Sequence, residues 1–477
     1  MNGAQGGRSA FERRTQIEVP ADQLGAWHFR AGAIHRLIPP WESIEVAQEA
    51  APLVDGARAR IVIRKGPIRT RLVAVHSEVD PPLQFVDTQE SGPFAAWRHL
   101  HRFEPAAAPA QSVLIDSIRY TLPFGVLGRT LLARPMAREI ARQFAFRHAR
   151  TRHDLLRHAE FAGRFGEAPM RVGVTGASGL VGRQLCAFLS TGGHEVVRFV
   201  RTAPRGASER RWDPRDVERG VDPASVSDLD CIVHLAGAGI ADRRWSEARK
   251  REILESRTLG TAALARGIAR AKTPPRAFVS SSAIGFYGDR GAEWVDEASG
   301  RGSGFLADVC DEWEHSTREA REAGVRTVHL RTGVVLTAAG GALAKMLPAF
   351  LFGAGGPIGS GSQGFSWIAL DDLLAATVFV ARATEISGPV NAVAPEALAQ
   401  REFARVLGRV VRRPSFAPLP AFAVRLLFGE MGQRALLEGA FVRPRVLREA
   451  GFRFAYPSLE DALRLELGRL VDPEGGR

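Results

Sequence analysis

Cysteine is scarce in this sequence of 477 residues. The three cysteines, Cys186, Cys231 and Cys310, are widely spaced and form no CxxC pair. This spacing argues against a disulfide framework and against a cysteine zinc site. A reducing compartment is therefore the simpler interpretation.

Long hydrophobic runs are also lacking. No apolar stretch reaches about 18 residues, the length of a membrane-spanning helix. The opening segment MNGAQGGRSAFERRTQ has no apolar core of signal-peptide type. The most apolar segment, FAPLPAFAVRLLFG (416–429), contains two prolines and Arg425. We expect a cytoplasmic protein without integral membrane contact.

Lysine is rare too: only four occur, so the net charge of +12 comes almost entirely from arginine. The arginines are spread along the chain and are densest between residues 129 and 157. There Arg134, Arg138 and Arg142 follow at intervals of four and share one helix face. A solvated helix face explains this pattern, and we predict no nucleic-acid partner.

The chain is too long for one hydrophobic core, and its patterning predicts three domains. Residues 1–165 contain alternating, strand-like stretches at 57–65, 70–79 and 112–122, followed by a helical stretch from about 134 to 158. They predict an α+β domain in which a long helix closes an antiparallel sheet. Residues 169–400 alternate short apolar strands with helices, which predicts an α/β, Rossmann-like doubly wound parallel sheet. Residues 401–477 predict a small helical domain.

The segment TGASGLVG (175–182) has the pattern of a phosphate-binding loop. Gly176, Gly179 and Gly182 follow a predicted strand and open a predicted helix, the arrangement of a dinucleotide loop. Small residues let the backbone approach a pyrophosphate, and the helix N-terminus offers free N–H groups. The cofactor contacts predicted here are Gly176, Ser178, Gly179, Leu180, Val181 and Gly182.

The end of the second predicted strand bears on cofactor choice. NAD sites usually place an acidic residue there to bind the ribose hydroxyls. This chain has Arg201 and Arg205 instead, with no acid between Glu195 and Glu209. Two guanidinium groups suit a 2′-phosphate, which favours NADP(H) over NAD(H). Exposed arginines of an arginine-rich chain are the alternative explanation.

Motif order then points to a family. VTGASGLVG, VHLAGAGI (233–240), VSSSAIGFYGD (279–289), CDEWE (310–314) and LRTGVVL (330–336) together resemble an extended short-chain dehydrogenase/reductase. They are most similar to an atypical epimerase-like family whose members end in a small helical domain of unknown function. The first block, with RLIPPWE, GPFAAWRHLHRF and YTLPFG, resembles a START-like (SRPBCC) helix-grip domain. The resemblance implies further cofactor contacts at Ala236, Gly237, Ser281 and Arg331, and a substrate edge at Trp367, Asp371 and Asn391.

The catalytic signature of that family is incomplete here. Extended enzymes use a Ser or Thr, and a Tyr with a Lys four residues later. None of the three tyrosines of this chain is followed by such a lysine. Alignment on CDEWE puts Leu306 and Cys310 at the Tyr and Lys places, while Ser282 matches the catalytic Ser.

Two interpretations remain open. The first is an NAD(P)-dependent oxidoreductase or epimerase-like enzyme that acts on a small molecule with relocated acid–base groups. Its catalytic candidates are Ser282, Tyr287 and Cys310, with Asp308 or Glu314 assisting. The second is a catalytically inactive sensor that binds NADP(H) and a lipid.

The START-like resemblance implies an apolar ligand in the N-terminal domain. Its lining candidates are Trp41, Trp97 and Phe124, with His99 and His101 as polar ones, and a filled core is the alternative. The spacing of two puts both histidines on the same face of a strand. Two histidines so placed can bind metal, but the sequence signals no third ligand, and we predict no metal site.

Overall fold

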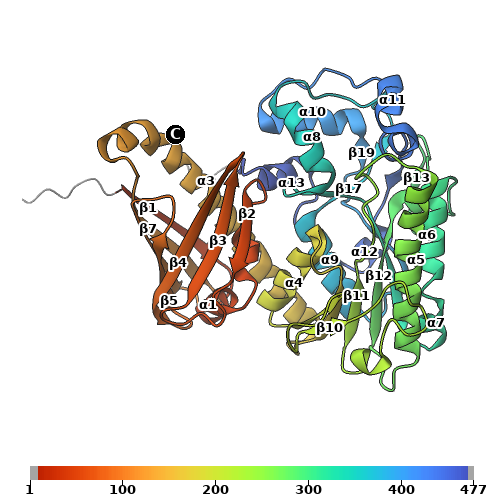
Figure 1. Ribbon diagram of the computed structural model, residues 1–477, viewed down its shortest axis with the longest axis horizontal. Coiled ribbons are helices and arrows are strands. Elements are labelled where there is room, and N and C mark those ends of the chain that lie inside the picture. Colours follow the sequence, from red (N-terminus) through yellow and green to blue (C-terminus); the bar gives the residue numbers. More distant parts are fainter. Residues whose placement is uncertain (1–8, 471–477) are drawn as a thin grey trace, which may run out of the picture. The chain divides into compact units, whose positions relative to one another are not determined.

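The computed structural model describes residues 9–470, which form two compact units (Figure 1). Within the described range, the first unit comprises 9–167, 187–193 and 465–470. The second comprises 168–186 and 194–464. Residues 401–464, predicted as a separate helical domain, thus cluster with the residues of the Rossmann-like sheet.

The first unit is built on an antiparallel sheet of seven strands in the order β1-β7-β6-β5-β4-β3-β2. The strands are β1 Ser9–Ile17, β2 Ser43–Gln48, β3 Arg58–Lys65, β4 Ile68–Asp80, β5 Gln84–Ser91, β6 Ala96–Pro105 and β7 Ser112–Thr121. The strands expected at 57–65, 70–79 and 112–122 correspond to β3, β4 and β7.

Three helices accompany this sheet: α1 Ala21–Phe29, α2 Ala33–Leu37 and α3 Gly125–Phe165. Helix α3 is longer than predicted, and Pro135 lies in its interior rather than in its first turn. Proline there removes the hydrogen bond to the carbonyl of Leu131. Leu131 is exposed, so water can satisfy that carbonyl.

The core of the first unit includes aliphatic and aromatic side chains from β1, α1, β5, β6, β7 and α3, among them Ile17, Trp27, Phe103 and Leu155. A salt bridge lies between α2 and α3. Arg36 donates to both carboxylate oxygens of Asp154, at 2.8 and 2.7 Å, and both side chains are 0% exposed. Such a closed pair fixes the two helices against each other.

The second unit contains a parallel sheet of seven strands in the order β10-β9-β8-β11-β12-β14-β18. The strands are β8 Arg171–Thr175, β9 Glu195–Val200, β10 Glu209–Arg211, β11 Cys231–His234, β12 Ala277–Ala283, β14 Arg326–Thr332 and β18 Gly388–Ala392. The chain runs outward from β8 to β10, then returns to β11 on the other side of β8. This reversal makes the carboxyl ends of β8 and β11 the topological switch point, where open α/β sheets bind ligands.

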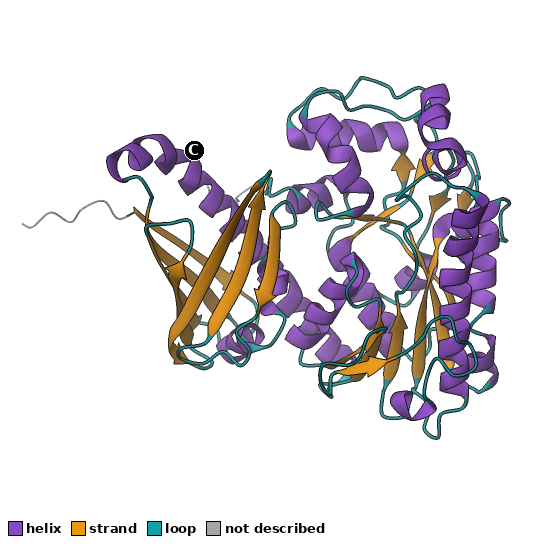
Figure 2. Ribbon diagram, in the orientation of Figure 1, coloured by secondary structure: helices purple, strands orange, loops and turns teal. Residues whose placement is uncertain are grey.

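Helices cover both faces of this sheet (Figure 2). The helices after residue 168 are α4 Leu180–Thr191, α5 Glu247–Ala269, α6 Phe305–His315, α7 Arg318–Glu322, α8 Gly341–Leu351, α9 Leu370–Arg382, α10 Gln400–Val411, α11 Ala421–Gly432, α12 Arg445–Glu449 and α13 Leu459–Glu466. Short helical turns lie at η1 Pro223–Val226, η2 Ile284–Tyr287 and η3 Gln433–Leu437. Two of these helices, α6 and α7, are separated by only two residues.

Three pairs of short strands complete the second unit. They are β13 Trp294–Val295 with β20 Phe441–Val442, β15 Val334–Leu336 with β17 Trp367–Ala369, and β16 Gly364–Phe365 with β19 Leu398–Ala399. The pairs β13–β20 and β16–β19 tie the C-terminal segments to the loops beyond the sheet. Among the described residues, no helix combines the length and the apolar character that a membrane crossing requires.

Candidate functional site

The glycine loop joins β8 to α4 at the switch point. Gly176 has φ +66°, and a Cβ there would lie 2.9 Å from the carbonyl carbon of Leu235 and 3.0 Å from the nitrogen of Ala236. A Cβ on Gly182 would overlap the carbonyl oxygen of Gly176. Both positions therefore require glycine, one for its conformation and one for the close packing of α4 on the loop.

Ser178 and Gly179, at the tip of the loop, are exposed and immediately precede Leu180, the first residue of α4. Leu180 and Val181 are half-buried in the first turn of α4. The tip thus combines small residues with the free N–H groups of a helix N-terminus. These residues fit the pyrophosphate of a dinucleotide.

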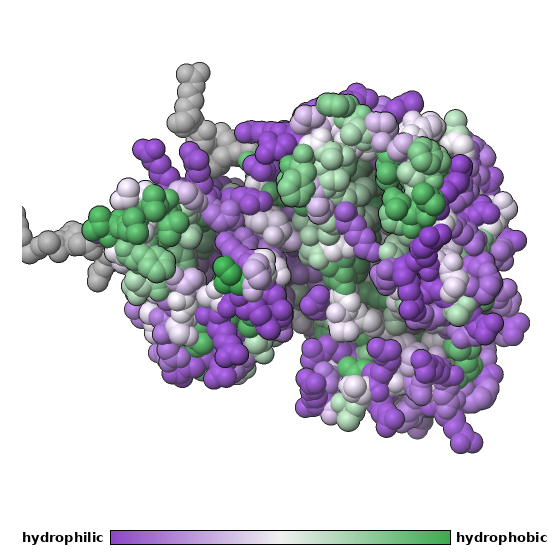
Figure 3. Space-filling model, turned by 45° about the horizontal axis from the view of Figure 1, so that its top comes forward, coloured by the Kyte–Doolittle hydropathy of each residue, from purple (hydrophilic) through white to green (hydrophobic). Residues whose placement is uncertain are grey.

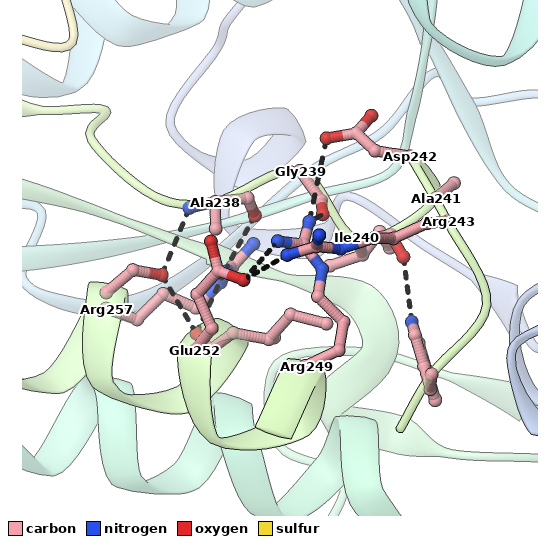
Figure 4. A network of polar contacts seen from close by, with 12 residues as sticks. Ala238, Gly239, Ile240, Ala241, Asp242, Arg243, Arg249, Glu252 and Arg257 are labelled. Carbon is pink, nitrogen blue, oxygen red and sulfur yellow. Dashed lines mark hydrogen bonds and ion pairs between the residues drawn. The ribbon is translucent and has the colours of Figure 1, made fainter. Parts of the chain in front are cut away.

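The loop after β11, residues 235–246, runs beside the glycine loop through Leu235 and Ala236. Basic side chains bind its carbonyls: Arg257 donates to Ala238 at 3.0 Å, Arg249 to Gly239, and Lys345 to Ala241 at 2.6 Å. Figure 4 shows Arg249 and Arg257 pointing from one helix towards this loop. Burial lowers the pKa of Arg257, the cost of placing this cation beneath the loop.

Glu252 joins the same network. Its Oε2 lies 2.7 Å from both Arg243 and Arg249 (Figure 4). The backbone of the loop is therefore fixed from below by charged groups. Ala236 is half-buried and Gly237 is exposed, so both lie where a ligand at the switch point can meet them.

Arg201 and Arg205 follow β9 directly and are exposed. The backbone N–H of Arg205 donates to the Glu209 carboxylate at 2.9 Å, which shapes the turn that presents both guanidinium groups.

Ser282 and Arg331 lie opposite each other on the neighbouring strands β12 and β14, near their carboxyl ends. Glu314, from α6, joins them. The Ser282 hydroxyl donates to Glu314 Oε1 at 2.7 Å, and Arg331 donates to both Glu314 oxygens at 2.8 Å. The bidentate pair holds the carboxylate in one orientation beneath the serine. Burial lowers the pKa of Arg331, but its bonds with Glu314 outweigh that effect and raise it.

Tyr287 extends this network. Its hydroxyl accepts from Arg331 at 3.1 Å and donates to Asn391 Oδ1 at 2.8 Å. Its side chain is 0% exposed, and burial raises the pKa of the phenol despite the nearby Arg331. A buried phenol whose proton is already donated to Asn391 is suited to positioning Arg331.

The Tyr and Lys places of the family are apolar. Leu306 and Cys310 lie on α6 beside Gly285, whose Cβ would be 3.3 Å from Leu306 Cβ and 3.7 Å from the Cys310 sulfur. Burial raises the pKa of Cys310 to about 12, so its thiol stays protonated. Glu314 is one turn further along the same face of α6. Asp308 is exposed and pairs with Arg301 at 2.7 Å, outside this network.

The predicted substrate edge lies in the interior. Trp367, Asp371 and Asn391 are 0%, 1% and 0% exposed. Asn391 joins the Ser282 network because its Oδ1 accepts from the Tyr287 hydroxyl, and its Nδ2 donates to the Arg443 carbonyl at 3.0 Å. Asp372 accepts from the backbone N–H groups of Ala455 and Tyr456, so it anchors the C-terminal segment. Ser281 is half-buried on β12 next to Ser282.

Two residues of this site were missed in the sequence. Glu297 accepts from the backbone N–H groups of Asn391, Arg445 and Val446, and it fixes the strand that carries Asn391. Arg257 supports the loop after β11. Only the fold brings each of them to its partners, and no local motif marks them.

The first unit holds a second polar cluster. His99 and His101 on β6 are buried and lie between two carboxylates, Asp87 on β5 and Asp116 on β7. The sequence signals no third metal-binding group beside the histidines, but the sheet register places Asp87 opposite His99. Burial alone would lower the pKa of His99, but Asp87 and Asp116 raise it to about 9.

The aromatic lining candidates lie in different places. Trp97 donates to Asp87 Oδ1 at 3.3 Å and belongs to the polar cluster. Trp41 packs edge-on against Phe146, with Arg142 stacked 4.2 Å above its ring. Phe124 is 79% exposed at the start of α3, so it lines no interior pocket.

These features define the class: an NAD(P)-binding, Rossmann-like fold of the extended short-chain dehydrogenase/reductase type, preceded in the sequence by an antiparallel helix-grip domain. The family model described as NAD dependent epimerase/dehydratase matches residues 172–392. The polyketide cyclase/dehydrase and lipid transport model matches 17–147, and a domain of unknown function matches 419–465.

Similar proteins agree with this class. An epimerase family protein of Mycobacterium bovis is 41% identical over 292 residues, 61% of this chain and 96% of that protein. The human epimerase family protein SDR39U1 is 35% identical over 298 residues, 62% of this chain and 99% of that protein. The chain belongs to the NAD-dependent epimerase/dehydratase family.

Solved structures extend the likeness to both units. A structure described as a nucleoside-diphosphate sugar epimerase of Corynebacterium glutamicum is 31% identical, covers 96% of this chain and 90% of its own, and has a TM-score of 0.78. Human SDR39U1 solved with NADPH is 36% identical, covers 63% of this chain and 100% of its own, and has a TM-score of 0.58.

Proposed function

We propose that the chain is an NADP(H)-dependent oxidoreductase or epimerase that acts on an apolar small molecule presented by its N-terminal domain. The observation that carries this proposal is the Ser282–Glu314–Arg331 network. It lies at the carboxyl ends of β12 and β14, the sheet edge that also bears the glycine loop. A bound dinucleotide supplies a hydride donor or acceptor at that edge.

Proton transfer is the task of the network. In the alcohol-oxidising direction, Ser282 Oγ takes the substrate hydroxyl proton while its own proton passes to Glu314. In the reducing direction both transfers reverse. An epimerase runs both directions in one turnover, so protons balance on the network, whereas an oxidoreductase exchanges the proton of Glu314 with solvent after each turnover. Arg331 keeps the carboxylate in place throughout, because it binds both oxygens.

The cofactor would be held by the glycine loop, with Arg201 and Arg205 facing a 2′-phosphate. Two observations support NADP(H): the exposed arginines after β9, and the similar human protein solved with NADPH. Arg201→Asp removes a phosphate partner and supplies a ribose partner. We expect the ratio of the dissociation constants for NADPH and NADH to shift at least ~10-fold towards NADH, measured by calorimetry.

Arg211→Asp on β10 is the matched control, because it makes the same charge change at another exposed arginine. An unchanged ratio in Arg201→Asp, or an equal shift in both variants, would assign Arg201 to the general surface.

An apolar substrate is supported by the surface of the second unit. Exposed large hydrophobic residues gather on and near α8 and α11 (Figure 3), and they are Leu351, Phe352, Phe416, Phe422, Leu426 and Leu427. Both helices contact the loop after β11: Lys345 binds Ala241, and Arg244 donates to the carbonyl of Leu426. Apolar groups thus border the switch-point loop, where a substrate would enter.

The sensor is the second candidate, favoured by the apolar Leu306 and Cys310 at the family's Tyr and Lys places. Purified chain with NADPH and an apolar metabolite extract distinguishes the two. An oxidoreductase oxidises NADPH, seen as a loss of nicotinamide absorbance, and an epimerase leaves that absorbance unchanged but produces a new isomer that chromatography of the extract detects. The sensor binds NADPH tightly but causes neither change with any fraction.

A further inference from the structure

The polar cluster in the first unit has the composition of a metal site. Two cross-strand pairs form it: Asp87 lies opposite His99, and His101 lies opposite Asp116. Because His99 and His101 are two residues apart on β6, both rings point to the same face of the sheet. Their ring centroids are 3.7 Å apart.

Asp87 and the two histidines converge on one point. Asp87 Oδ2 lies 3.1 Å from His99 Nδ1 and 3.0 Å from His101 Nε2. Ligand atoms around a tetrahedral zinc ion, at bonds of about 2.0–2.1 Å, are about 3.3 Å from each other. The three groups therefore need to separate only slightly to admit an ion.

Asp116 can bind the ring nitrogens of His99 and His101 that do not face Asp87. Its Oδ1 lies 3.0 Å from His99 Nε2 and 2.9 Å from His101 Nδ1, although the latter pair is not aligned as a hydrogen bond. Metal-binding histidines commonly donate their other N–H to a carboxylate, which fixes the tautomer and the ring. One aspartate here can orient both rings.

Further side chains hold Asp116, Asp87 and His101 in place. Asp116 Oδ2 lies 2.8 Å from His148 Nε2, and His148 Nδ1 lies 2.7 Å from Thr15 Oγ1. Trp97 donates to the second oxygen of Asp87. Phe85 stacks on His101 at 4.1 Å between centroids, so the rings are also held by apolar packing. His101 Nδ1 is buried and has no aligned hydrogen-bond partner, and it faces the carboxylate of Asp116.

We propose that Asp87, His99 and His101 bind one divalent transition-metal ion of the zinc class, with Asp116 orienting both imidazoles. Imidazole and carboxylate ligands suit such borderline ions better than Mg²⁺ or Ca²⁺. Each ring binds the ion with one nitrogen and donates with the other, so both are neutral and two close cationic rings are avoided. Three protein ligands leave a fourth position for water or for a polar group of the domain's ligand.

The test uses the full chain, freed of metal with a chelator and titrated with Zn²⁺ by calorimetry. We expect one equivalent to bind, and Co²⁺ to give visible absorption bands of a tetrahedral site. His99→Gln and Asp87→Asn should weaken Zn²⁺ binding at least ~100-fold, and Asp116→Asn ~10- to 100-fold. His76→Gln is the matched control, because His76 is a buried histidine of the same sheet that binds the Ala57 carbonyl instead.

If the wild-type chain takes up no Zn²⁺, or if uptake is unchanged in His99→Gln, the proposal is wrong and these residues form only a hydrogen-bonded cluster. If a variant does not fold, the wild type still decides: Zn²⁺ should raise the melting temperature of the first unit and Mg²⁺ should not. Equal effects of both ions overturn the proposal. NADPH affinity should stay unchanged in every variant, so this result is independent of the proposed function.

Discussion

At the scale of single residues, the proposed chemistry depends on a charged pair, Glu314 and Arg331, rather than on the Tyr and Lys of the family. The family's Tyr and Lys places hold Leu306 and Cys310, and Glu314 one turn later takes the position next to Ser282. A carboxylate can accept a proton from a serine, whereas a thiol that stays protonated cannot. In the proposed reaction, proton transfer therefore depends on Ser282 and Glu314 together.

Ser282→Ala removes the hydroxyl that would meet the substrate. Turnover should fall ~10²- to 10⁴-fold, because a positioned acid–base group is lost, while NADPH affinity stays nearly unchanged. Steady-state rates and calorimetry measure the two effects. Cys310→Ala is the control and should have little effect on turnover. Full activity in Ser282→Ala would exclude the proposed proton path.

Gly179→Asp places a carboxylate at the tip of the glycine loop. The new Cβ would lie 3.2 Å from the Gly176 carbonyl oxygen, so the fold should persist with a small local shift. The added charge should weaken dinucleotide binding by at least ~3 kcal/mol. Gly300→Asp, at an exposed glycine with open space for a Cβ, is the control. Equal binding by both variants, with intact folds, would contradict the loop assignment.

At the scale of elements, periodicity predicted most strands and helices. The predicted helix after the glycine loop and the second predicted strand correspond to α4 and β9, because apolar spacing there follows burial directly. The start of α3 was missed, since the exposed Val126, Leu127 and Leu131 carry no amphipathic signal. Glu297 and Asp87 could not be assigned, because their partners are set by sheet register and long-range packing.

Strand β11 carries a pH-dependent contribution to stability. His234 at its end is 0% exposed, and burial, with a smaller effect of Arg257, lowers its pKa to about 3. In the unfolded chain a histidine titrates near 6.5, so between these values the unfolded state binds the extra proton. The free energy of unfolding should therefore decrease as pH falls from about 6.5 towards 3, by about 1 kcal/mol per pH unit from this group.

Denaturant titrations of the wild type and His234→Gln check this expectation. The variant should lose the contribution of His234 to the pH dependence. The difference in free energy of unfolding between wild type and variant should therefore change as pH falls from about 6.5 towards 3. His315→Gln, on an exposed histidine of α6, is the control. If the free energies of unfolding of the wild type and His234→Gln differ by a constant amount from pH 7 to pH 4, His234 is not the source of the pH dependence.

At the scale of the whole molecule, the first unit includes residues far apart in the sequence. Arg142 donates to the carbonyls of Leu467 and Gly468, and Arg150 pairs with Glu466, both side chains being at most 3% exposed. Ending the chain after residue 464 removes these partners and the buried Leu467. The first unit should lose at least ~3 kcal/mol of stability, measured as a lower melting temperature.

A chain that ends after residue 470 is the control, because it keeps every one of these contacts. If the two chains melt alike, residues 465–470 do not contribute to the stability of the first unit.

These closing contacts bear on synthesis. A ribosome releases the N-terminal sheet and α3 first, and a domain normally folds as soon as it emerges. Here Arg142 and Arg150 cannot form their bonds to Glu466, Leu467 and Gly468 at that stage, because these partners are translated more than 300 residues later. The first unit therefore reaches its final form only after the second unit has been translated. A nascent chain that stalls before residue 465 carries an unfinished first unit, which quality-control proteases can recognise.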